Sequence, residues 1–471
     1  MSEQHFEPYL YLAGLTHDSA LIAWGGFFFK VRDQKDWKLI DDDDLPDIDQ
    51  ERRECIGARS KPYGSARVEV IDSAGTVRAA ETNDKNHVWI TGLLPGTEYT
   101  YRVLVDGKEW AAGERLDWVV GPEGRGLRNN GGVYVNRFRT HAAPDESAAL
   151  TFAVIGDFGT GVKKESTRSR RQREVAAALN RAVDERGVRL ILTAGDNIYA
   201  GKRFLGLPIG DTGDEDDDWF FTFYQPYRYV INRVPVYPCV GNHDSGETEQ
   251  SDDREQLFDN FFIDERFSGE HSQGPASQGP GLFYRFKYGR DIEFLCIDTS
   301  RQTKLFDHRF FERPHHLAFV QEALPEPASQ PADSPLWRIP FSHHPAFCAG
   351  PVHSNSKSMG RVLVPLFERA GVRAAFSGHE HNFQHSRSRG VNYFITGGGG
   401  KVEQSDPSDF DGAHTVAWGK GGHFLVVEVD SEKMSVTPMA EATDGAPLRN
   451  LRVTAPNGDG SVEMPIIVDR G

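Results

Sequence analysis

The sequence predicts two successive regions of different fold class, an all-β region followed by an α/β region. Between about Tyr9 and Thr140, short apolar or alternating runs are separated by Gly, Asp and Asn, without convincing helical periodicity. After a short segment at 142–147, apolar runs alternate with helical stretches, the pattern of a sheet with crossover helices. The length of 471 residues also exceeds what one ordinary core fills, which favours two domains.

Strands are expected in the first region at residues 20–24, 66–71, 87–90, 99–103 and 135–140. Segments 25–62 and 110–132 interrupt this pattern and are expected to form large loops. The segment 92–103 resembles the corner of a fibronectin type III domain, in which a buried tyrosine, here Tyr99, hydrogen-bonds back across the turn. Trp24 fits the same pattern. We therefore expect a fibronectin type III-like β-sandwich at residues 8–142.

The second region begins with an expected strand at 150–155, an amphipathic helix at 168–186 and a strand at 188–193. This order predicts a βαβ crossover, in which the two strands are parallel. Further strands are expected at 234–240, 282–286, 292–297, 337–341, 373–376, 393–396 and 423–429. The proline-rich stretch 325–335 is expected to be a surface connection.

Five short polar segments each follow one of these strands. They are Gly156–Gly159, Gly195–Tyr199, Gly241–Asp244, Ser342–Pro345 and Gly378–His381. Ligands of open α/β sheets bind at the carboxyl ends of strands, so the segments are expected to share one site. They offer carboxylate, amide and imidazole donors, which is the mixture that two closely spaced cations need.

Each segment alone has a simpler explanation, because a Gly-Asp pair after a strand is often only a turn. The segment 157–159 lacks the glycine-rich loop and HRD segment of a kinase, and 397–401 lacks the spacing and Ser/Thr of a P-loop. The tetrapeptide Gly-Asn-His-Asp at 241–244 is rare by composition. Its occurrence in order with Gly-His-Glu-His at 378–381 favours a metal site over coincidence.

Over residues 149–441 this order of motifs resembles the metallophosphoesterase superfamily, and within it the purple acid phosphatases. Two positions select that branch. Residue 159 is Gly where most of the superfamily has a metal-binding His, and Tyr199, three residues after Asp196, stands where purple acid phosphatases place a tyrosinate. The resemblance implies an α/β four-layer sandwich, two mixed β-sheets flanked by helices, at residues 148–441, with 442–471 as a C-terminal extension.

The resemblance also implies a binuclear metal centre. The implied ligands are Asp157, Tyr199 and His381 for the first metal, Asn242, His343 and His379 for the second, and Asp196 as the bridge. Fe(III) is expected at the first position, because a phenol of pKa about 10 is deprotonated more readily by a trivalent cation. Zn, Mn or Fe(II) is expected at the second. The alternative for the tyrosine is a packed, hydrogen-bonded side chain.

Two histidines match positions at which the family contacts phosphate or protonates the leaving group. They are His243, beside Asn242, and His353, ten residues after His343. His344 could instead fill either role or hydrogen-bond a backbone carbonyl. The order of His343 and His344 could also be reversed. The expected function is phosphomonoester hydrolysis. The alternatives are hydrolysis of phosphodiesters or nucleotide pyrophosphates at the same metals, or a non-catalytic adhesion or scaffold role.

The formal charge of -16 disfavours binding to nucleic-acid polymers or to anionic membranes, so the expected partner is a small phosphate ester. The acidic segment 201–218 either lines the site, where it would repel highly charged phosphates, or is a solvated loop.

The chain shows neither a long apolar stretch nor an export signal, so a cytoplasmic location is expected, or secretion if a leader has been removed. Four cysteines, Cys55, Cys239, Cys296 and Cys348, lack CxxC spacing and indicate neither a disulfide scaffold nor a zinc knuckle. The sequence does not predict the oligomeric state.

Overall fold

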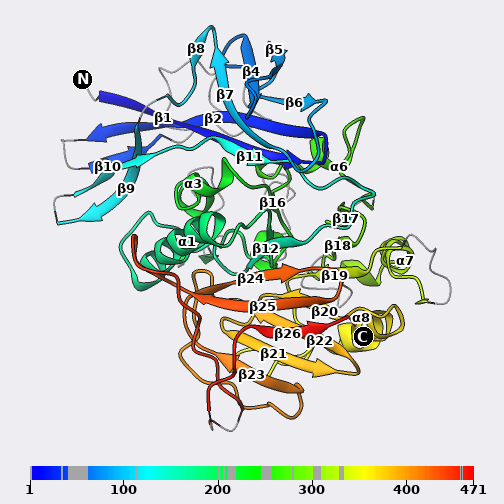
Figure 1. Cartoon of the computed structure of the whole chain (residues 1–471). Helices are drawn as coiled ribbons and strands as arrows, with labels where there is room; N and C mark the ends of the chain where they lie inside the picture. Colours follow the sequence, from blue (N-terminus) through cyan, green and yellow to red (C-terminus); the bar gives the residue numbers. More distant parts are fainter. Residues whose placement is uncertain are drawn as a thin grey trace.

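The computed structural model describes residues 3–32, 36–40, 62–112, 114–122, 124–199, 202–204, 207–209, 219–245, 257–277, 281–300, 309–327, 334–456, 458 and 460–470. A strand-rich first region, blue to cyan in Figure 1, packs against a second region that contains mixed sheets and a few helices. Among the described residues, no helix is long and apolar enough to cross a bilayer.

The first region contains two sheets. One has the order β1-β2-β3-β10-β9, with β6 also paired to β2, and the other has the order β11-β7-β4-β5, with β8 paired to β7. The strands are β1 (Glu3–Leu15), β2 (Ser19–Arg32), β3 (Asp36–Leu39), β4 (Ala66–Asp72), β5 (Val77–Thr82), β6 (His87–Thr91), β7 (Glu98–Val105), β8 (Lys108–Glu109), β9 (Glu114–Gly121), β10 (Gly124–Val133) and β11 (Arg137–Arg139).

The expected strands of this region are present, but the two expected loops are wrong where the structure describes them. Strand β2 runs on through Gly25 and Gly26 to Arg32 and pairs with β3, while residues 114–133 form the β9–β10 hairpin. The glycines do not break the strand; they make room for aromatic rings on its face. A Cβ on Gly25 would lie 2.5 Å from Cζ of Tyr9. Residues 41–61 of the first expected loop lie outside the described part of the chain.

Strand β1 contributes to two cores, because successive side chains of a strand point to opposite faces. Leu10 and Leu12 pack between the two sheets of the first region. Tyr9 and Tyr11 face the second region, where the ring of Tyr9 lies 4.5 Å from that of Tyr224. One sheet is therefore buried on both faces, and its outer aromatic layer joins the two regions.

The corner expected at Tyr99 is present. Tyr99 is buried, and its hydroxyl oxygen accepts a hydrogen bond from the Leu94 backbone N–H at 2.9 Å. Trp24 is fully buried in the same core. These contacts fix the turn that leads into β7.

The second region contains two larger sheets, β16-β13-β12-β24-β25-β26 and β17-β18-β19-β20-β22-β21-β23. The first consists of β12 (Leu150–Ile155), β13 (Ile191–Thr193), β16 (Val236–Tyr237), β24 (His423–Val429), β25 (Lys433–Ala440) and β26 (Ile466–Asp469). The second consists of β17 (Tyr284–Tyr288), β18 (Ile292–Cys296), β19 (Trp337–Phe341), β20 (Ala374–Ser377), β21 (Phe383–Ser388), β22 (Val391–Thr396) and β23 (Thr415–Gly419). A separate hairpin joins β14 (Lys202–Phe204) and β15 (Leu207–Ile209).

Helices complete the second region. They are α1 (Thr167–Glu185), the π-helix η5 (Phe220–Tyr224), α3 (Arg228–Ile231), α4 (Asn242–Ser245), α6 (Ile263–Phe267), the 3₁₀ helix η6 (Phe310–Glu312), α7 (Pro314–Ala323) and α8 (Lys357–Arg369). Strands β12 and β13 pair in parallel with α1 between them, so the predicted crossover is confirmed.

The two large sheets face each other through aromatic side chains. The ring of Phe152 on β12 lies 5.1 Å from that of Phe294 on β18 and 6.0 Å from that of Phe376 on β20. Helix α1 buries Leu179 in the core of the first sheet, and α8 buries Leu363 in a core that it shares with strands of the second sheet. Aromatic rings therefore fill the space between the two sheets, and each of these helices packs an apolar side chain into a core.

Substitution of Phe152 by alanine is expected to lower the free energy of unfolding by about 3–5 kcal/mol, because it removes a fully buried ring from between the two sheets. Urea unfolding followed by circular dichroism measures this loss. Val77→Ala, at a side chain that is 50 % exposed, serves as the control and is expected to change stability by less than about 0.5 kcal/mol. A Phe152→Ala loss below about 1 kcal/mol would contradict this packing role.

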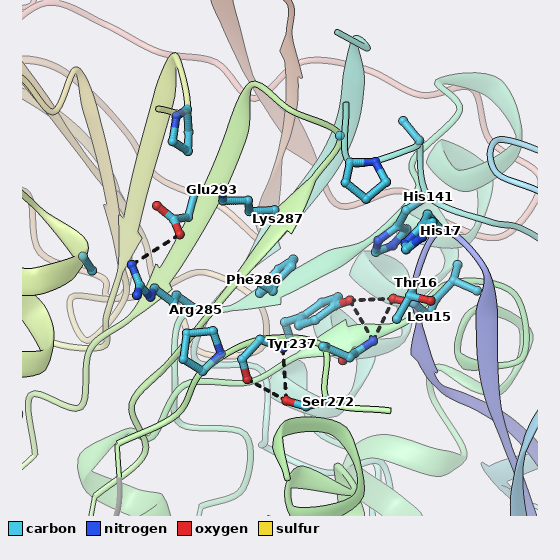
Figure 2. Close-up of a pocket in the computed structure, with 18 of the residues that line it drawn as sticks. Leu15, Thr16, His17, His141, Tyr237, Ser272, Arg285, Phe286, Lys287 and Glu293 are labelled. Carbon is cyan, nitrogen blue, oxygen red and sulfur yellow. Dashed lines mark hydrogen bonds and ion pairs between the residues drawn. The ribbon is translucent and has the colours of Figure 1, made fainter. Parts of the chain in front are cut away.

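The two regions also meet around a cavity of about 720 Å³ (Figure 2). At its wall the carbonyl oxygen of Leu15 accepts hydrogen bonds from the Gln273 amide at 2.7 Å and the Tyr237 hydroxyl at 3.4 Å. His17 and His141 line the same cavity. None of the residues predicted to bind metal lines it. The chemistry expected from the sequence therefore lies elsewhere.

Candidate metal centre

The five polar segments come together where strands of both large sheets end. Asp157 follows β12 and Asp196 follows the parallel strand β13, while His343 follows β19 and His379 follows β20 of the other sheet. Asn242 opens α4 after β16. The facing of the two sheets therefore brings these five positions, which are distant in sequence, to one place.

One cluster forms around the carboxylate of Asp157, which is fully buried. Its Oδ1 accepts a hydrogen bond from the Tyr199 hydroxyl at 3.2 Å and lies 3.4 Å from Nε2 of His381. Its Oδ2 accepts the backbone N–H of His379 at 2.8 Å. Tyr199 has no exposed surface. The phenol and the imidazole expected to share the first metal thus both lie beside the carboxylate of Asp157.

A second cluster forms around Nε2 of His343. This atom lies 2.9 Å from Oδ1 of Asn242, 3.0 Å from Nδ1 of His379 and 3.4 Å from Oδ1 of Asp196. The other ring nitrogen of His343 lies 2.8 Å from the Ala194 carbonyl oxygen, to which it donates. That hydrogen bond orients the ring so that Nε2 faces the cluster. Burial works to lower the pKa of His343, but the charges of Asp196 and Asp157 raise it, so a cation bound at Nε2 would take the place of a proton.

The two clusters are joined. Ligand atoms of Asp157, Asp196 and His343 all lie within 4.8 Å of one another, and all three side chains are buried. Asp196 also accepts the backbone N–H of His243 at 3.0 Å. Asp196 therefore lies between the residues expected for the first metal and those expected for the second.

The donor set fits metal ions. Ligand atoms about 2.0–2.2 Å from one ion, at octahedral or tetrahedral angles, lie about 2.8–3.6 Å from one another. The contacts around Asp157 and His343 span 2.9–3.4 Å. Two buried carboxylates also demand positive charge, because an uncompensated charge is costly to bury.

The pKa shifts of the clustered side chains also favour metal binding. Burial works to raise the pKa of Asp157, but the hydrogen bond from His381 and the charge of His343 hold it below its usual range. Burial lowers the pKa of His379 far below its ordinary value, and the nearby His343 lowers it further. Burial and then the charges of Asp157 and Asp196 raise the pKa of Tyr199. His379 is therefore neutral with a lone pair to donate, and the phenol stays neutral unless a cation replaces its proton.

Three of the clustered residues adopt left-handed backbone conformations, which residues other than glycine rarely do. The φ angles are 58° at Asp157, 50° at Asp196 and 72° at His379. Such conformations cost of order 1–3 kcal/mol each and concentrate at functional sites. Their occurrence at three of the clustered residues therefore favours a functional site here.

Two glycines are required by close approach. A Cβ on Gly159 would lie 2.4 Å from backbone atoms of Asn197 and Ile198, and one on Gly241 would lie 2.1 Å from Oδ1 of Asp196. The Tyr199 N–H donates to the Gly159 carbonyl at 3.1 Å. A side chain at position 159 is therefore excluded by the same backbone contact that positions the tyrosine.

Asp244, which sequence reasoning left without a role, ties two of the loops together. Its carboxylate accepts hydrogen bonds from the backbone N–H of Ile198 at 3.0 Å, the backbone N–H of Gly241 at 2.7 Å and the Asn197 amide at 2.8 Å. Burial and the nearby charge of Asp196 raise its pKa to about 7. These three donors converge on one carboxylate, which gives Asp244 a structural role at the end of this motif.

The three histidines expected to act on substrate occupy different positions. The ring of His243 lies 4.6 Å from that of Tyr199, beside the first cluster. The ring of His353 stacks 3.7 Å from that of His379, beside the second. His353 is held by Glu380, whose carboxylate accepts from the His353 backbone N–H at 2.8 Å and lies 3.2 Å from its Nδ1. Glu380 is fully buried and was not singled out by the sequence reasoning, although it lies inside a recognised motif.

His344 is buried behind these residues. Its Nδ1 and its backbone N–H both lie 3.0 Å from the hydroxyl of Thr299, a residue without any sequence signal. Burial, and next the charge of His379, lowers the pKa of His344 far below its ordinary value. The ligand atoms of His343, His344 and His379 also lie within 4.8 Å of one another. Of the adjacent pair, His343 is the one that faces Asp196 and Asn242.

The acidic segment 201–218, expected at the rim or in solvent, lies largely outside the described residues. Only the backbone of its β14–β15 hairpin is described. Among the cysteines, Cys239, Cys296 and Cys348 are buried free thiols, and Cys55 lies outside the described part.

Comparison with known proteins shows which family the second region resembles. The sequence profile of the family called Calcineurin-like phosphoesterase matches residues 150–383. Purple acid phosphatase 4 of Arabidopsis thaliana is 26 % identical over 270 residues, which cover 55 % of this chain and 70 % of that protein. Human tartrate-resistant acid phosphatase type 5 is 26 % identical over 314 residues, which cover 63 % and 88 %.

Two solved structures share the fold of nearly the whole chain. The structure of purple acid phosphatase PPD1 from yellow lupin seeds superposes with a TM-score of 0.58 at 14 % identity, covering 96 % of this chain and 74 % of that one. The structure of PhoD superposes with a TM-score of 0.61 at 13 % identity, covering 97 % and 92 %. At these identities the likeness establishes fold, and it extends over the strand-rich first region.

Proposed function

Residues 150–383 of this chain are a calcineurin-like phosphoesterase domain, and the chain is a phosphoric ester hydrolase related to the purple acid phosphatases; from this premise we propose that it hydrolyses phosphomonoesters at a binuclear metal centre. The observation that supports the proposal most is the convergence of Asp157, Tyr199 and His381 with Asp196, Asn242, His343 and His379 at contact distances of 2.8–3.4 Å.

In this proposal Asp157, Tyr199 and His381 hold the first metal. Asn242, His343 and His379 hold the second, and Asp196 bridges them. Fe(III) is proposed at the first position because its phenol donor is fully buried and surrounded by carboxylates, so only a strongly polarising cation displaces its proton. Zn, Mn or Fe(II) is proposed at the second, where the donors are neutral imidazoles, an amide and the shared carboxylate.

When bound, such metals lower the pKa of bound water and neutralise the phosphate oxygens. The chain's own residues then serve the leaving alcohol. His353 is proposed to donate its proton from Nε2, because Nδ1 faces the Glu380 carboxylate at 3.2 Å. His243 is proposed to contact phosphate from beside the first cluster. His344 is tied to Thr299, which favours a role in supporting the neighbouring His379 over proton transfer.

The proposed substrates are small phosphate esters. The net charge of -16 opposes nucleic-acid polymers and anionic membranes as partners. Hydrolysis of phosphodiesters or nucleotide pyrophosphates would use the same metals and is the second candidate. A scaffold role without catalysis is the third.

We also propose the finer architecture expected from the sequence. The two facing sheets with α1 and α8 on their outer sides support a four-layer α/β sandwich at residues 148–441, and the Tyr99 corner supports a fibronectin type III-like sandwich at 8–142. Strand β26, from the segment proposed as an extension at 442–471, pairs with β25 and extends the first sheet.

The test compares initial rates on p-nitrophenyl phosphate and bis-p-nitrophenyl phosphate. Faster hydrolysis of the monoester is expected, and faster hydrolysis of the diester would replace the first candidate with the second. An Asp196→Asn protein prepared in parallel measures contaminating phosphatase. Metal analysis of protein purified without chelators is expected to find about two transition metals per chain. Fewer than one, together with no activity, would favour the scaffold role.

A further inference from the structure

Lys401 reaches the buried tyrosine of the metal centre from a loop that no proposed ligand occupies. Its Nζ lies 3.5 Å from the centroid of the Tyr199 ring. The lysine ends the glycine-rich segment 397–401 after β22, and its side chain is half-buried. The ammonium therefore lies over the face of the ring, where a cation is attracted by the π-electrons.

The position of Lys401 is fixed by its backbone. The N–H groups of Gly400 and Lys401 donate to the Asp157 carbonyl at 3.0 and 3.3 Å, and the Glu403 N–H donates to the His381 carbonyl at 3.0 Å. The loop is thus bonded to two segments that carry proposed ligands of the first metal. These backbone hydrogen bonds hold Lys401 next to the Tyr199 ring.

Lys401 brings a positive charge to a ring that has three carboxylates near it. The buried groups around Tyr199 are the carboxylates of Asp157, Asp196 and Asp244, all of which disfavour a negative phenolate. An ammonium over the ring acts in the opposite direction. Because Nζ lies over the ring and not at the hydroxyl, it stabilises electrons on the aromatic system without occupying the oxygen's place as a donor to metal.

We infer that Lys401 tunes the tyrosinate, lowering the energy of the phenolate electrons and so weakening their donation to the first metal. This inference rests on the proposed iron–tyrosinate site. Its consequence is spectroscopic: the phenolate-to-iron charge transfer needs more energy while the ammonium is present. It follows that the iron is also easier to reduce than it would be without Lys401.

The experiment records visible spectra of iron-loaded full-length protein. Lys401→Met and Lys401→Gln are expected to shift the charge-transfer band to longer wavelength. Lys401→Arg keeps the positive charge, so its band is expected to shift from the wild-type wavelength by less than the bands of the two neutral variants. Lys433→Met is the matched control. It removes the same charge at the start of β25, next to the end of the sheet where β12 begins at Leu150. Asp157 follows the opposite end of β12, so Lys433 lies away from the proposed metal site. It is expected to leave the band unchanged.

The possible results distinguish the role of Lys401 from the presence of the tyrosinate. A wild-type band that neither neutral variant moves overturns the role of Lys401 and leaves the tyrosinate intact. Iron-containing wild-type protein without any such band overturns the tyrosinate and, with it, the tuning role. Iron content and far-ultraviolet circular dichroism of each variant confirm that the spectra compare folded, loaded proteins. The same shift in Lys433→Met would assign the effect to net charge and would also overturn the inference.

Discussion

Replacing Asp196 with asparagine is expected to lower kcat for phosphomonoester hydrolysis by more than about 100-fold and to weaken the binding of both metals. Asparagine keeps the size and one oxygen of the side chain, but it loses the negative charge and the second carboxylate oxygen. Asp196 lies between the two clusters, 3.4 Å from Nε2 of His343, and is buried to 1 % exposure. A neutral amide at this place cannot bridge two cations or balance their charge.

The measurement pairs steady-state kinetics with elemental analysis of protein purified without chelators. Asp184→Asn is the matched control, since Asp184 lies on α1, is half exposed and pairs with Arg137 and Arg233. That substitution removes the same charge and is expected to change kcat less than about twofold, because Asp184 is not one of the proposed metal ligands or substrate contacts. Wild-type metal content and activity in Asp196→Asn would show that this carboxylate does not bridge a catalytic centre.

The candidate site was largely predictable because its residues occupy positions that sheet geometry brings together. Asp157, Asp196 and His343 each follow a strand that the sequence marks by an apolar run. The parallel strands β12 and β13 end at one edge of their sheet, and His343 follows β19 of the facing sheet. The predicted strands at 150–155, 337–341 and 423–429 match β12, β19 and β24. The pattern was strong there because a strand buried on both faces is apolar throughout.

What the sequence could not predict depends on long-range contacts. Gly25 and Gly26 indicated a break, yet the strand continues because Tyr9 packs over the space they leave. Strand β26 is short and pairs only with β25, so no local periodicity marks it. Thr299 reaches His344 across 45 positions of sequence, and a single threonine carries no motif. The role of Glu380 required the position of His353, which only the folded chain fixes.

Tyr199→Phe is expected to abolish the visible absorption of the iron-loaded protein while leaving the fold intact, because it removes the one proposed donor whose electrons give a charge-transfer band. The phenol is fully buried and its hydroxyl donates to Asp157 at 3.2 Å, so phenylalanine fills the same space and removes only the oxygen. Tyr99→Phe is the control, since it removes another buried hydroxyl that accepts one hydrogen bond at 2.9 Å within the first region. It is expected to keep the band and to lose about 1 kcal/mol of stability.

The Tyr199→Phe protein is also expected to bind Fe(III) at the first metal position more weakly, relative to divalent ions, than the wild type does. The reason is that the substitution removes the donor best suited to a trivalent cation. Absorption spectra and metal content measured on the same samples test both statements. A band that survives in Tyr199→Phe, or a colourless and active wild-type protein with two zinc ions, would show that Tyr199 is a packing residue and that the first metal is divalent.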